Sequence, residues 1–209
     1  MTDPFRTVAG RGEAAFEVRG SAFRGHVAPA DAVAEAETFV ESVRGEHADA
    51  THNVPAYRVP AGEASTRTPG GDVMLREYAS DDGEPTGSAG KPALNVLVQR
   101  DLRNVVAVVT RYYGGTNLGV GGLARSYGRA VKDAVDDAGV VERVPRVRFA
   151  ATVEYDDSGT VRGLLESAGA EFDAAYEADV RFDVRVPVDD ADALRDRLRS
   201  ATGGRVRIE

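Results

Sequence analysis

VVAVVTRYYGGTNLGVGGLARSYG, residues Val105–Gly128, joins a strand pattern to a helix pattern through a loop with five glycines. The β-branched run up to Tyr112 predicts a central strand that is covered by other elements. A helical pattern with a basic face follows over about residues 121–138. Because glycine adds no side-chain bulk and a helix N-terminus carries partial positive charge, this junction predicts a backbone surface for a negatively charged group.

A second stretch, Ser80–Pro92 (SDDGEPTGSAGKP), places three carboxylates and one lysine in a turn-rich loop. Loops held on a rigid frame often carry function, so we expect the two stretches to line one groove. Arg111 should then lie within reach of a carboxylate of Asp81, Asp82 or Glu84.

The residues before these stretches predict an antiparallel start to the fold. Residues 14–27 read as one or two short strands that are broken at Gly20 and Gly25. Asp31 is the expected N-cap of a helix over residues 32–46, where apolar residues recur on one face.

Further elements follow along the first part of the chain. Asn53–Pro60 predicts a strand, residues 74–78 a short one, and the polar segment Ala61–Asp72 a loop. A helix is expected to begin at Pro92, and Gly139 is expected to end the helix that follows the glycine loop.

The pattern restarts after Val144-Pro145. Strands are predicted near residues 147–155, 170–176, 180–188 and 205–208, with helices from Asp157 to Gly169 and over residues 189–201. This β-α-β-β-α-β order is typical of a ferredoxin-like sandwich. We therefore predict an α+β protein with two domains, residues 1–144 and 145–209.

Composition limits the class of protein. The chain of 209 residues has no cysteine, which excludes disulfides and thiolate metal sites. Its first residues lack a signal-peptide core and no apolar run reaches membrane-spanning length, so a cytoplasmic protein is expected. The net charge is −8, and Lys91 and Lys132 are the only lysines against 24 arginines. Acidic and lysine-poor composition suggests a halophilic source.

The basic residues are not evenly spread. Between Arg100 and Lys132 there are six of them against the single acid Asp101, a local charge of +5. One interpretation is a phosphate-facing surface, with Arg125, Arg129 and Lys132 on the helix. The other is that these side chains are solvated or pair with the nearby acids Asp133, Asp136 and Asp137.

The glycine loop also fits other patterns. Gly119, Gly121 and Ala124 match G-x-G-x-x-A, but an acid at the tip of a second strand is missing, and no G-K-[ST] follows. A general phosphate cradle and tight packing of the helix on the sheet both remain open. Tyr112 and Tyr113 should point to opposite sides of their strand, where an exposed ring beside Arg111 would suit stacking on a base.

Catalytic and metal sites have little support in the sequence. His47, Asp49 and His52 do not have the spacing of a known metal motif, and no serine has a base that the sequence can place beside it. We therefore expect no metal, no cofactor and no catalytic residue.

The two stretches together resemble the paired signature of the YigZ/IMPACT family, in the same order and spacing. Glu46–His52, EHADATH, resembles that family's EHPDA-x-H segment, with Ala48 where many members have proline. The resemblance implies an N-terminal α/β sandwich similar to the second domain of ribosomal protein S5. It also implies a C-terminal domain similar to the ferredoxin-like last domain of elongation factor G.

The resemblance also implies a function. Eukaryotic relatives restrain the starvation-responsive initiation-factor kinase by competing for its activator, which points to a noncatalytic translation-linked regulator that binds RNA, the ribosome or a translation-regulatory protein. The expected binding residues are Asp81, Asp82, Glu84, Lys91, Arg111, Tyr112, Tyr113, Gly114, Gly115, Gly119, Gly121, Gly122, Arg125, Arg129 and Lys132. The alternatives are a protein-protein regulator and a small-molecule phosphate enzyme. The oligomeric state stays open.

Overall fold

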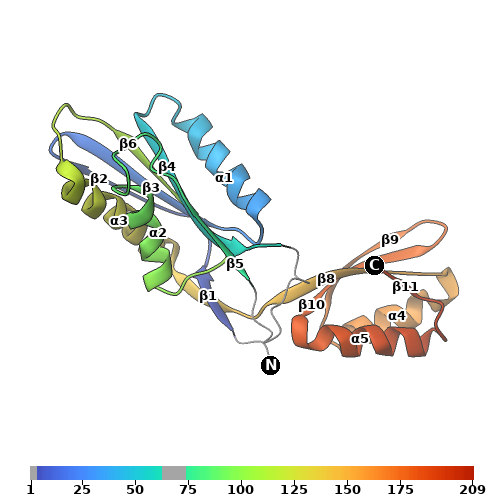
Figure 1. The fold of residues 1–209 in the computed structure, drawn as a ribbon. Coiled ribbons are helices and arrows are strands. Elements are labelled where there is room, and N and C mark those ends of the chain that lie inside the picture. The colour runs from blue at the N-terminus through green and yellow to red at the C-terminus, as the bar shows by residue number, and fades with distance from the viewer. Residues whose placement is uncertain (1–3, 63–73) are drawn as a thin grey trace. The chain divides into compact units, whose positions relative to one another are not determined.

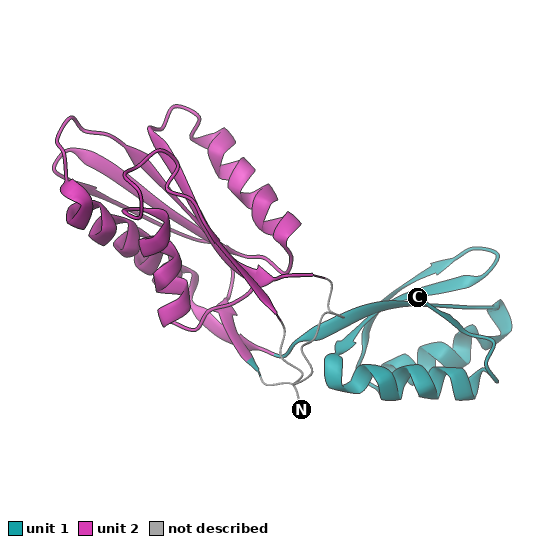
Figure 2. Cartoon of the chain, in the orientation of Figure 1, with its two compact units in different colours: residues 1–4, 144–209 teal, residues 5–143 magenta. Residues whose placement is uncertain are grey.

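The computed structural model describes residues 4–62 and 74–209, so most of the predicted loop Ala61–Asp72 lies outside the described residues (Figure 1). The chain divides into two compact units (Figure 2). One comprises residues 5–143, and the other comprises residues 144–209 together with Pro4. In the described part of the chain, no helix is long and apolar enough to cross a membrane.

A five-stranded sheet forms the larger unit, with the order β2-β3-β6-β4-β5. Every neighbouring pair in it is antiparallel. The strands are β2 (Gly12–Val18), β3 (Ser21–Pro29), β4 (His52–Pro60), β5 (Leu75–Ala79) and β6 (Val105–Tyr112). β6 lies at the centre and all but its last residue are buried, as its β-branched sequence predicts.

Gly25 does not break its strand, contrary to the sequence prediction. It lies within β3, opposite Ala14 of β2. A Cβ at Gly25 would lie 2.2 Å from the carbonyl oxygen of Ala130. The absence of a side chain at Gly25 therefore allows the helix α3 (Gly119–Ala138), which contains Ala130, to pack closely on the sheet. Gly20, by contrast, has a φ of +82° and forms the turn between β2 and β3.

Three helices cover the sheet (Figure 1). α2 (Gly90–Gln99) and α3 (Gly119–Ala138) pack on one face, where α3 covers β2 and β3, and α1 (Val33–Glu46) packs on the other, against β4 and β6. The α3 side holds the larger core, around Phe23, Leu97 and Tyr127. Tyr57, Val106 and Val108 lie in the core under α1.

The starts of α1 and α2 differ from the predictions. The N-cap of α1 is Ala32 and not Asp31, whose backbone N–H instead donates to the Glu35 carboxylate at 2.8 Å. α2 begins at Gly90, two residues before Pro92, because a carboxylate outside the helix accepts hydrogen bonds from its first N–H groups.

Sequence patterns did not predict a two-stranded sheet at the end of the larger unit. It pairs β1 (Phe5–Val8) with β7 (Val140–Arg143) in antiparallel register, directly after α3 ends at Gly139. Both strands have four residues, too few for alternation of polar and apolar residues to identify them.

The smaller unit contains a four-stranded antiparallel sheet with the order β11-β8-β10-β9. Its strands are β8 (Arg146–Val153), β9 (Glu171–Tyr176), β10 (Val180–Pro187) and β11 (Arg207–Ile208). With α4 (Tyr155–Ser167) and α5 (Val188–Ala201), the unit has the β-α-β-β-α-β order of a ferredoxin-like sandwich. The predicted α+β fold class is confirmed.

The sequence suggested Asp157 as the start of α4, but Asp157 is not its N-cap. The cap is Glu154, so the helix begins at Tyr155 and β8 ends two residues earlier than predicted. Asp157 lies in the first turn, where Arg205 donates two hydrogen bonds to its carboxylate at 2.8 and 2.9 Å. Phe182, Leu165 and Leu198 lie in the core that joins the sheet to both helices.

Candidate binding site

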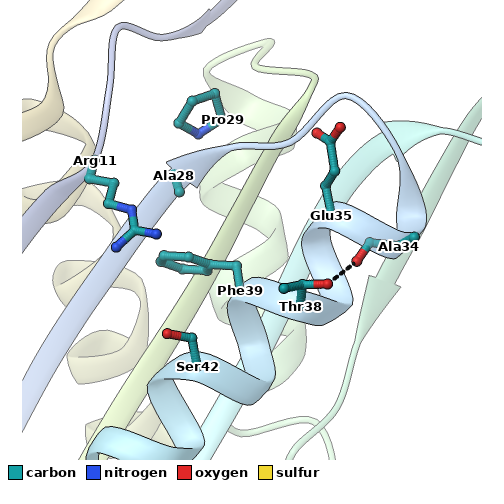
Figure 3. Close-up of a pocket in the computed structure, with 8 residues that line it drawn as sticks. All are labelled: Arg11, Ala28, Pro29, Ala34, Glu35, Thr38, Phe39 and Ser42. Carbon is teal, nitrogen blue, oxygen red and sulfur yellow. Dashed lines mark hydrogen bonds between the residues drawn. The ribbon is translucent and has the colours of Figure 1, made fainter.

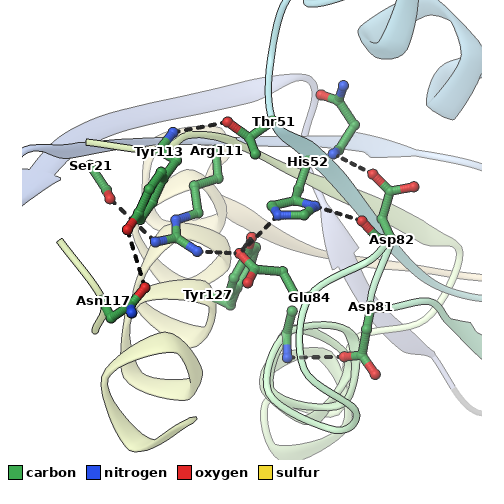
Figure 4. Close-up of polar contacts among 12 residues, drawn as sticks. Ser21, Thr51, His52, Asp81, Asp82, Glu84, Arg111, Tyr113, Asn117 and Tyr127 are labelled. Carbon is green, nitrogen blue, oxygen red and sulfur yellow. Dashed lines mark hydrogen bonds and ion pairs between the residues drawn. The ribbon is translucent and has the colours of Figure 1, made fainter. Parts of the chain in front are cut away.

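The two signature stretches meet at the carboxylate of Glu84 (Figure 4). Arg111 of β6 donates to its Oε1 atom at 2.6 Å, and the Tyr127 hydroxyl of α3 donates to the same atom at 2.7 Å. His52 Nε2 lies 3.8 Å from it. Glu84 is 8% exposed and Arg111 is 4% exposed. The predicted contact between Arg111 and a carboxylate of the loop is thus confirmed, as a buried ion pair.

Arg111 is held on several sides. Its second terminal nitrogen donates to Ser21 Oγ at 3.3 Å, and its guanidinium carbon lies 5.5 Å from the centroid of the Phe23 ring and 5.3 Å from that of the Tyr113 ring. Its Nε atom is buried and has no hydrogen-bond partner among the described residues. These contacts make Arg111 a residue that positions the loop and not one that a ligand can touch directly.

Asp81 stabilises the start of α2. Its carboxylate accepts hydrogen bonds from the backbone N–H groups of Gly87, Ala89 and Gly90 at 2.7, 3.0 and 2.8 Å. Burial alone would raise the pKa of Asp81, but these three hydrogen bonds lower it below its ordinary value. The carboxylate therefore does the work of an N-cap from outside the helix.

Asp82 joins the loop to the neighbouring strand. Its Oδ2 atom accepts from the backbone N–H of Asn53 at 2.7 Å, and Arg44 of α1 contacts Oδ1 at 3.4 Å. The carbonyl oxygen of Asp82 lies 2.6 Å from His52 Nδ1. Asp82 holds a φ of +46°, a left-handed conformation that these contacts fix. All three carboxylates of the loop are therefore already engaged.

The two tyrosines after Arg111 lie apart, and neither is in the core. Tyr112 is half-buried on the α1 side, where its hydroxyl donates to Asp49 at 3.2 Å and lies 2.9 Å from His47 Nδ1. Tyr113 is 46% exposed, and its hydroxyl donates to Asn117 at 3.1 Å. Tyr113 therefore presents an exposed aromatic ring close to the N-terminal end of α3.

The five glycines of the loop have different roles. Gly114 packs directly on the β2–β3 turn, since a Cβ there would lie 2.0 Å from Gly20. Gly115 and Gly119 have φ values of +82° and +71° with nothing within 4 Å, so their conformation and not their packing requires glycine. Gly121 and Gly122 lie in the first turn of α3, whose N-cap, Leu118, makes no side-chain hydrogen bond.

The basic residues of the +5 segment are only partly available. Arg100 pairs with Asp136 at 2.6 Å, and Arg129 pairs with Asp133 at 3.1 Å while stacking on Phe16. The expectation that nearby acids neutralise these arginines holds for both pairs. Among the described residues, Lys91, Arg125 and Lys132 are the exposed cations of this region that form no ion pair.

Lys91 and Arg125 lie on neighbouring helices. The carbonyl oxygen of Pro92 lies 3.9 Å from where a Cβ of Gly128 would be, so the start of α2 packs against α3 at this point. Arg125 lies one turn before Gly128, and its guanidinium is 3.5 Å from where a Cβ of Gly121 would be. We name Lys91, Tyr113, Gly115, residues 119–122 and Arg125 the α3 surface.

Sequence reasoning missed several members of this site. Tyr127, Ser21, Asn117 and His52 were not among the expected binding residues. The signal for Tyr127 was available, because a buried tyrosine hydroxyl normally finds a hydrogen-bond partner. Its pKa is raised strongly by burial and then by the hydrogen bond to Glu84.

Other types of site find no support in the geometry. The strand pairing around β6 is antiparallel, which is not the arrangement of a dinucleotide-binding fold. Within residues 4–62 and 74–209, no group of three or more histidine or acidic residues could hold a metal ion. His47 and His52 contact Tyr112 and the Asp82 carbonyl oxygen instead.

Comparison with known proteins agrees with this architecture. Residues 19–135 match the Impact N-terminal domain, and residues 152–205 match a domain of unknown function, DUF1949. The chain is 33% identical to the IMPACT family member YvyE of Bacillus subtilis over 100% of this chain and 92% of the relative. It is 36% identical to YigZ of Escherichia coli over 82% of this chain and 80% of the relative.

A solved structure of a hypothetical protein gives the same result in three dimensions. It covers 100% of this chain and 97% of its own, with 32% identity and a TM-score of 0.70. Its whole-length match includes both units of this fold. The chain belongs to the IMPACT family.

Proposed function

We propose that this protein is a noncatalytic, translation-linked regulator that binds RNA, alone or in the ribosome, through the α3 surface. The observation that carries the proposal is that the acidic groups of the site are bound by the protein itself, while basic groups of the same site are exposed and unpaired among the described residues. All three carboxylates of the Ser80–Pro92 loop are engaged by the protein itself, whereas Lys91 and Arg125 are exposed without an ion pair among the described residues.

The start of α3 supports binding of a phosphate group. The first N–H groups of a helix have no partner within the helix. The N-cap of α3 is Leu118, whose side chain makes no hydrogen bond to these N–H groups. They carry partial positive charge, which favours an anion at this point. The open space above Gly115 and Gly119 leaves room for a phosphodiester to approach the backbone closely.

Tyr113 supports a nucleic acid over a simple phosphate. Its exposed ring is backed by the Arg111 guanidinium and fixed by the hydrogen bond to Asn117. An aromatic face held in this way can stack on a base without sequence preference, and such stacking is worth about 1–3 kcal/mol per base. Lys132 would extend the contact along α3, and Arg129 would add less because Asp133 already pairs with it.

The family supports the link to translation. The resemblance of the two signature stretches to the YigZ/IMPACT family implies a role near the translation apparatus, where RNA is the abundant polyanion. A small-molecule phosphate enzyme is less favoured, because Asp81, Asp82 and Glu84 are occupied and leave no free carboxylate to act as a base. The expected compartment of such a regulator is the cytoplasm.

The test is the salt dependence of RNA affinity. Binding of a single-stranded RNA oligonucleotide is measured at several salt concentrations for the wild type and for the double variant Lys91→Ala/Arg125→Ala. Each lost phosphate contact reduces the slope of log K against log salt by about 0.7 for a single strand, so the double variant should lose about 1.4. Thermal melts should hardly change, because both side chains are exposed and unpaired.

A matched control removes the same charge elsewhere. Arg197→Ala/Arg199→Ala on α5 changes the net charge equally but lies in the smaller unit. It should lower affinity slightly and leave the slope within error of the wild type. If the wild type binds no RNA, or if both double variants reduce the slope alike, the proposal is wrong.

A further inference from the structure

The two faces of the five-stranded sheet are covered unequally. On one face α3 packs on β2 and β3, and α2 packs on β4 and β5. On the other face α1 packs on β4 and β6 (Figure 1). The part of this face that β2 contributes carries the exposed residues Glu13, Ala15 and Glu17. One face of the sheet is thus covered by two helices, and the other face is covered by α1 alone among the described residues.

A groove of about 510 Å³ lies along α1 on this less covered face (Figure 3). Its apolar wall contains the Phe39 ring, over which the Arg11 guanidinium lies 5.5 Å from the centroid. The hydroxyl of Thr38 donates to the Ala34 carbonyl oxygen at 2.7 Å and so needs no other partner. We name this groove the α1 groove; its lining residues are Arg11, Ala28, Pro29, Ala34, Glu35, Thr38, Phe39 and Ser42.

Acidic side chains lie in and beside the α1 groove. Glu35 lines it directly, and Glu46 accepts a hydrogen bond of 3.2 Å from the lining residue Ser42. Glu13 of β2 lies 3.6 Å from Nδ1 of His26, in the strand β3 that also contributes Ala28 and Pro29 to the groove. Among the lining residues, Arg11 and Glu35 carry one charge of each sign, and Glu13 and Glu46 beside the groove bring the net charge of these four side chains to −2.

We propose that the α1 groove binds an amphipathic helix of a protein partner, with an apolar stripe against Phe39 and basic residues beside Glu13, Glu35 and Glu46. A helix is the expected occupant because it would lie beside α1 and complete a two-helix layer on this face. Basic residues are expected because complementary charge fixes the orientation of a helix in a groove. This surface lies on the opposite face of the sheet from the α3 surface, so the two ligands would not compete.

The experiment uses the full chain and a fluorescein-labelled helical peptide of about 18 residues, made of leucine, lysine and alanine with one leucine stripe. Fluorescence anisotropy gives its dissociation constant. Two further peptides serve as probes: one with glutamate in place of lysine, and one of the same composition in scrambled order. The basic amphipathic peptide should bind at least about tenfold more tightly than either of them.

Variants then test the location of binding. Thr38→Arg fills the groove and adds one positive charge at an exposed position, and it should weaken peptide binding at least about tenfold. Glu37→Gln changes the charge equally on the neighbouring exposed residue, which does not line the groove, and should bind nearly as the wild type does. Phe39→Ala should weaken binding as well, and Thr38→Arg remains informative if Phe39→Ala fails to fold.

Several results would overturn the proposal. These are absence of binding, equal binding of all three peptides, or equal loss in Thr38→Arg and Glu37→Gln. Sedimentation of the free protein tests a second copy as the occupant. A dimer that Thr38→Arg dissociates would assign the groove to self-association and not to a partner. RNA affinity in the Thr38→Arg variant should equal that of the wild type.

Discussion

The Arg111 guanidinium and the Glu84 carboxylate form a buried ion pair at 2.6 Å that joins the end of the central strand β6 to the acidic loop. Tyr127 completes the contact from α3, so the strand, the loop and the helix meet at one oxygen atom. This arrangement fixes the backbone from which Tyr113 and the start of α3 face solvent. We infer that the pair serves the binding surface by holding its shape.

Removing one partner of this pair should be strongly destabilising. Glu84→Gln leaves the Arg111 charge buried without a counterion, and Arg111→Met leaves the Glu84 charge in the same state, at a cost of about 3–5 kcal/mol each. The double variant Glu84→Gln/Arg111→Met should lose much less than the sum, because neither charge is then unpaired. Urea denaturation measures all three free energies of unfolding. Simple additivity would contradict a direct coupling.

Asp81 should contribute to stability in a pH-dependent way. Asp81→Ala removes the acceptor of three N–H groups at the start of α2 and should cost about 1–2 kcal/mol. The folded pKa of Asp81 is lower than its unfolded value of about 3.8, so this stabilisation is fully present above that value and is lost as the pH falls through the folded pKa. The free-energy difference between wild type and Asp81→Asn, from urea titrations at pH 6 and pH 3, should shrink at the lower pH. A difference that is the same at both pH values would exclude the charged carboxylate as its source.

His26 should make the larger unit sensitive to mild acid. Burial lowers the pKa of His26 below 6.5, the Glu13 carboxylate opposes this, His47 lowers it further, and Glu46 raises it. Its Nε2 atom is buried without a partner among the described residues. Because the unfolded state binds the proton more readily, stability should fall as the pH drops through 6.5 toward the folded pKa.

Two variants isolate this effect. In His26→Gln, the fall in melting temperature between pH 8 and pH 5 should be smaller than in the wild type. Glu13→Gln removes the carboxylate that favours the charged imidazole, so the fall should be larger. If His26→Gln keeps the full acid sensitivity of the wild type, another group is responsible.

The two units should fold independently. The predicted domain boundary at residues 144/145 falls beside the division of the chain into residues 5–143 and 144–209. Residues 144–209, expressed alone, should unfold cooperatively in urea, since they have their own core around Phe182 and Leu165. Limited proteolysis of the full chain should release a stable fragment that ends near Arg143. A disordered isolated fragment would contradict independent folding.

The sequence was most informative where periodicity is long. The run that became β6 and the two-faced pattern that became α3 have enough residues to identify both elements. The short strands β1 and β7 could not be found in this way, because each is defined by pairing with a distant segment. Gly25 was misjudged as a break because its role depends on the approach of the Ala130 backbone, which no local pattern contains.

The sequence predicted many of the residues that lie at the candidate site, but it did not predict what each of them contacts. The charges of the two stretches predicted a contact between Arg111 and the acidic loop, but they could not tell which carboxylate would be buried. Asp81 and Asp82 looked like ligand-binding groups, and they bind backbone N–H groups of this protein instead. Tertiary hydrogen bonds and ion pairs decide which charges remain available, and this is why Lys91, Arg125 and Lys132 can be singled out only from the structure.

The most direct test of the central claim follows the backbone amides of residues 119–122 by NMR while a single-stranded RNA oligonucleotide is added. If RNA phosphate lies at the start of α3, the amide signals of Gly119, Gly121 and Gly122 should shift in a saturable, salt-sensitive way, together with the side-chain signals of Tyr113. Amides on α5 should stay in place. Saturable shifts that spare residues 113–125 and occur elsewhere, or no shifts at all, would contradict the account.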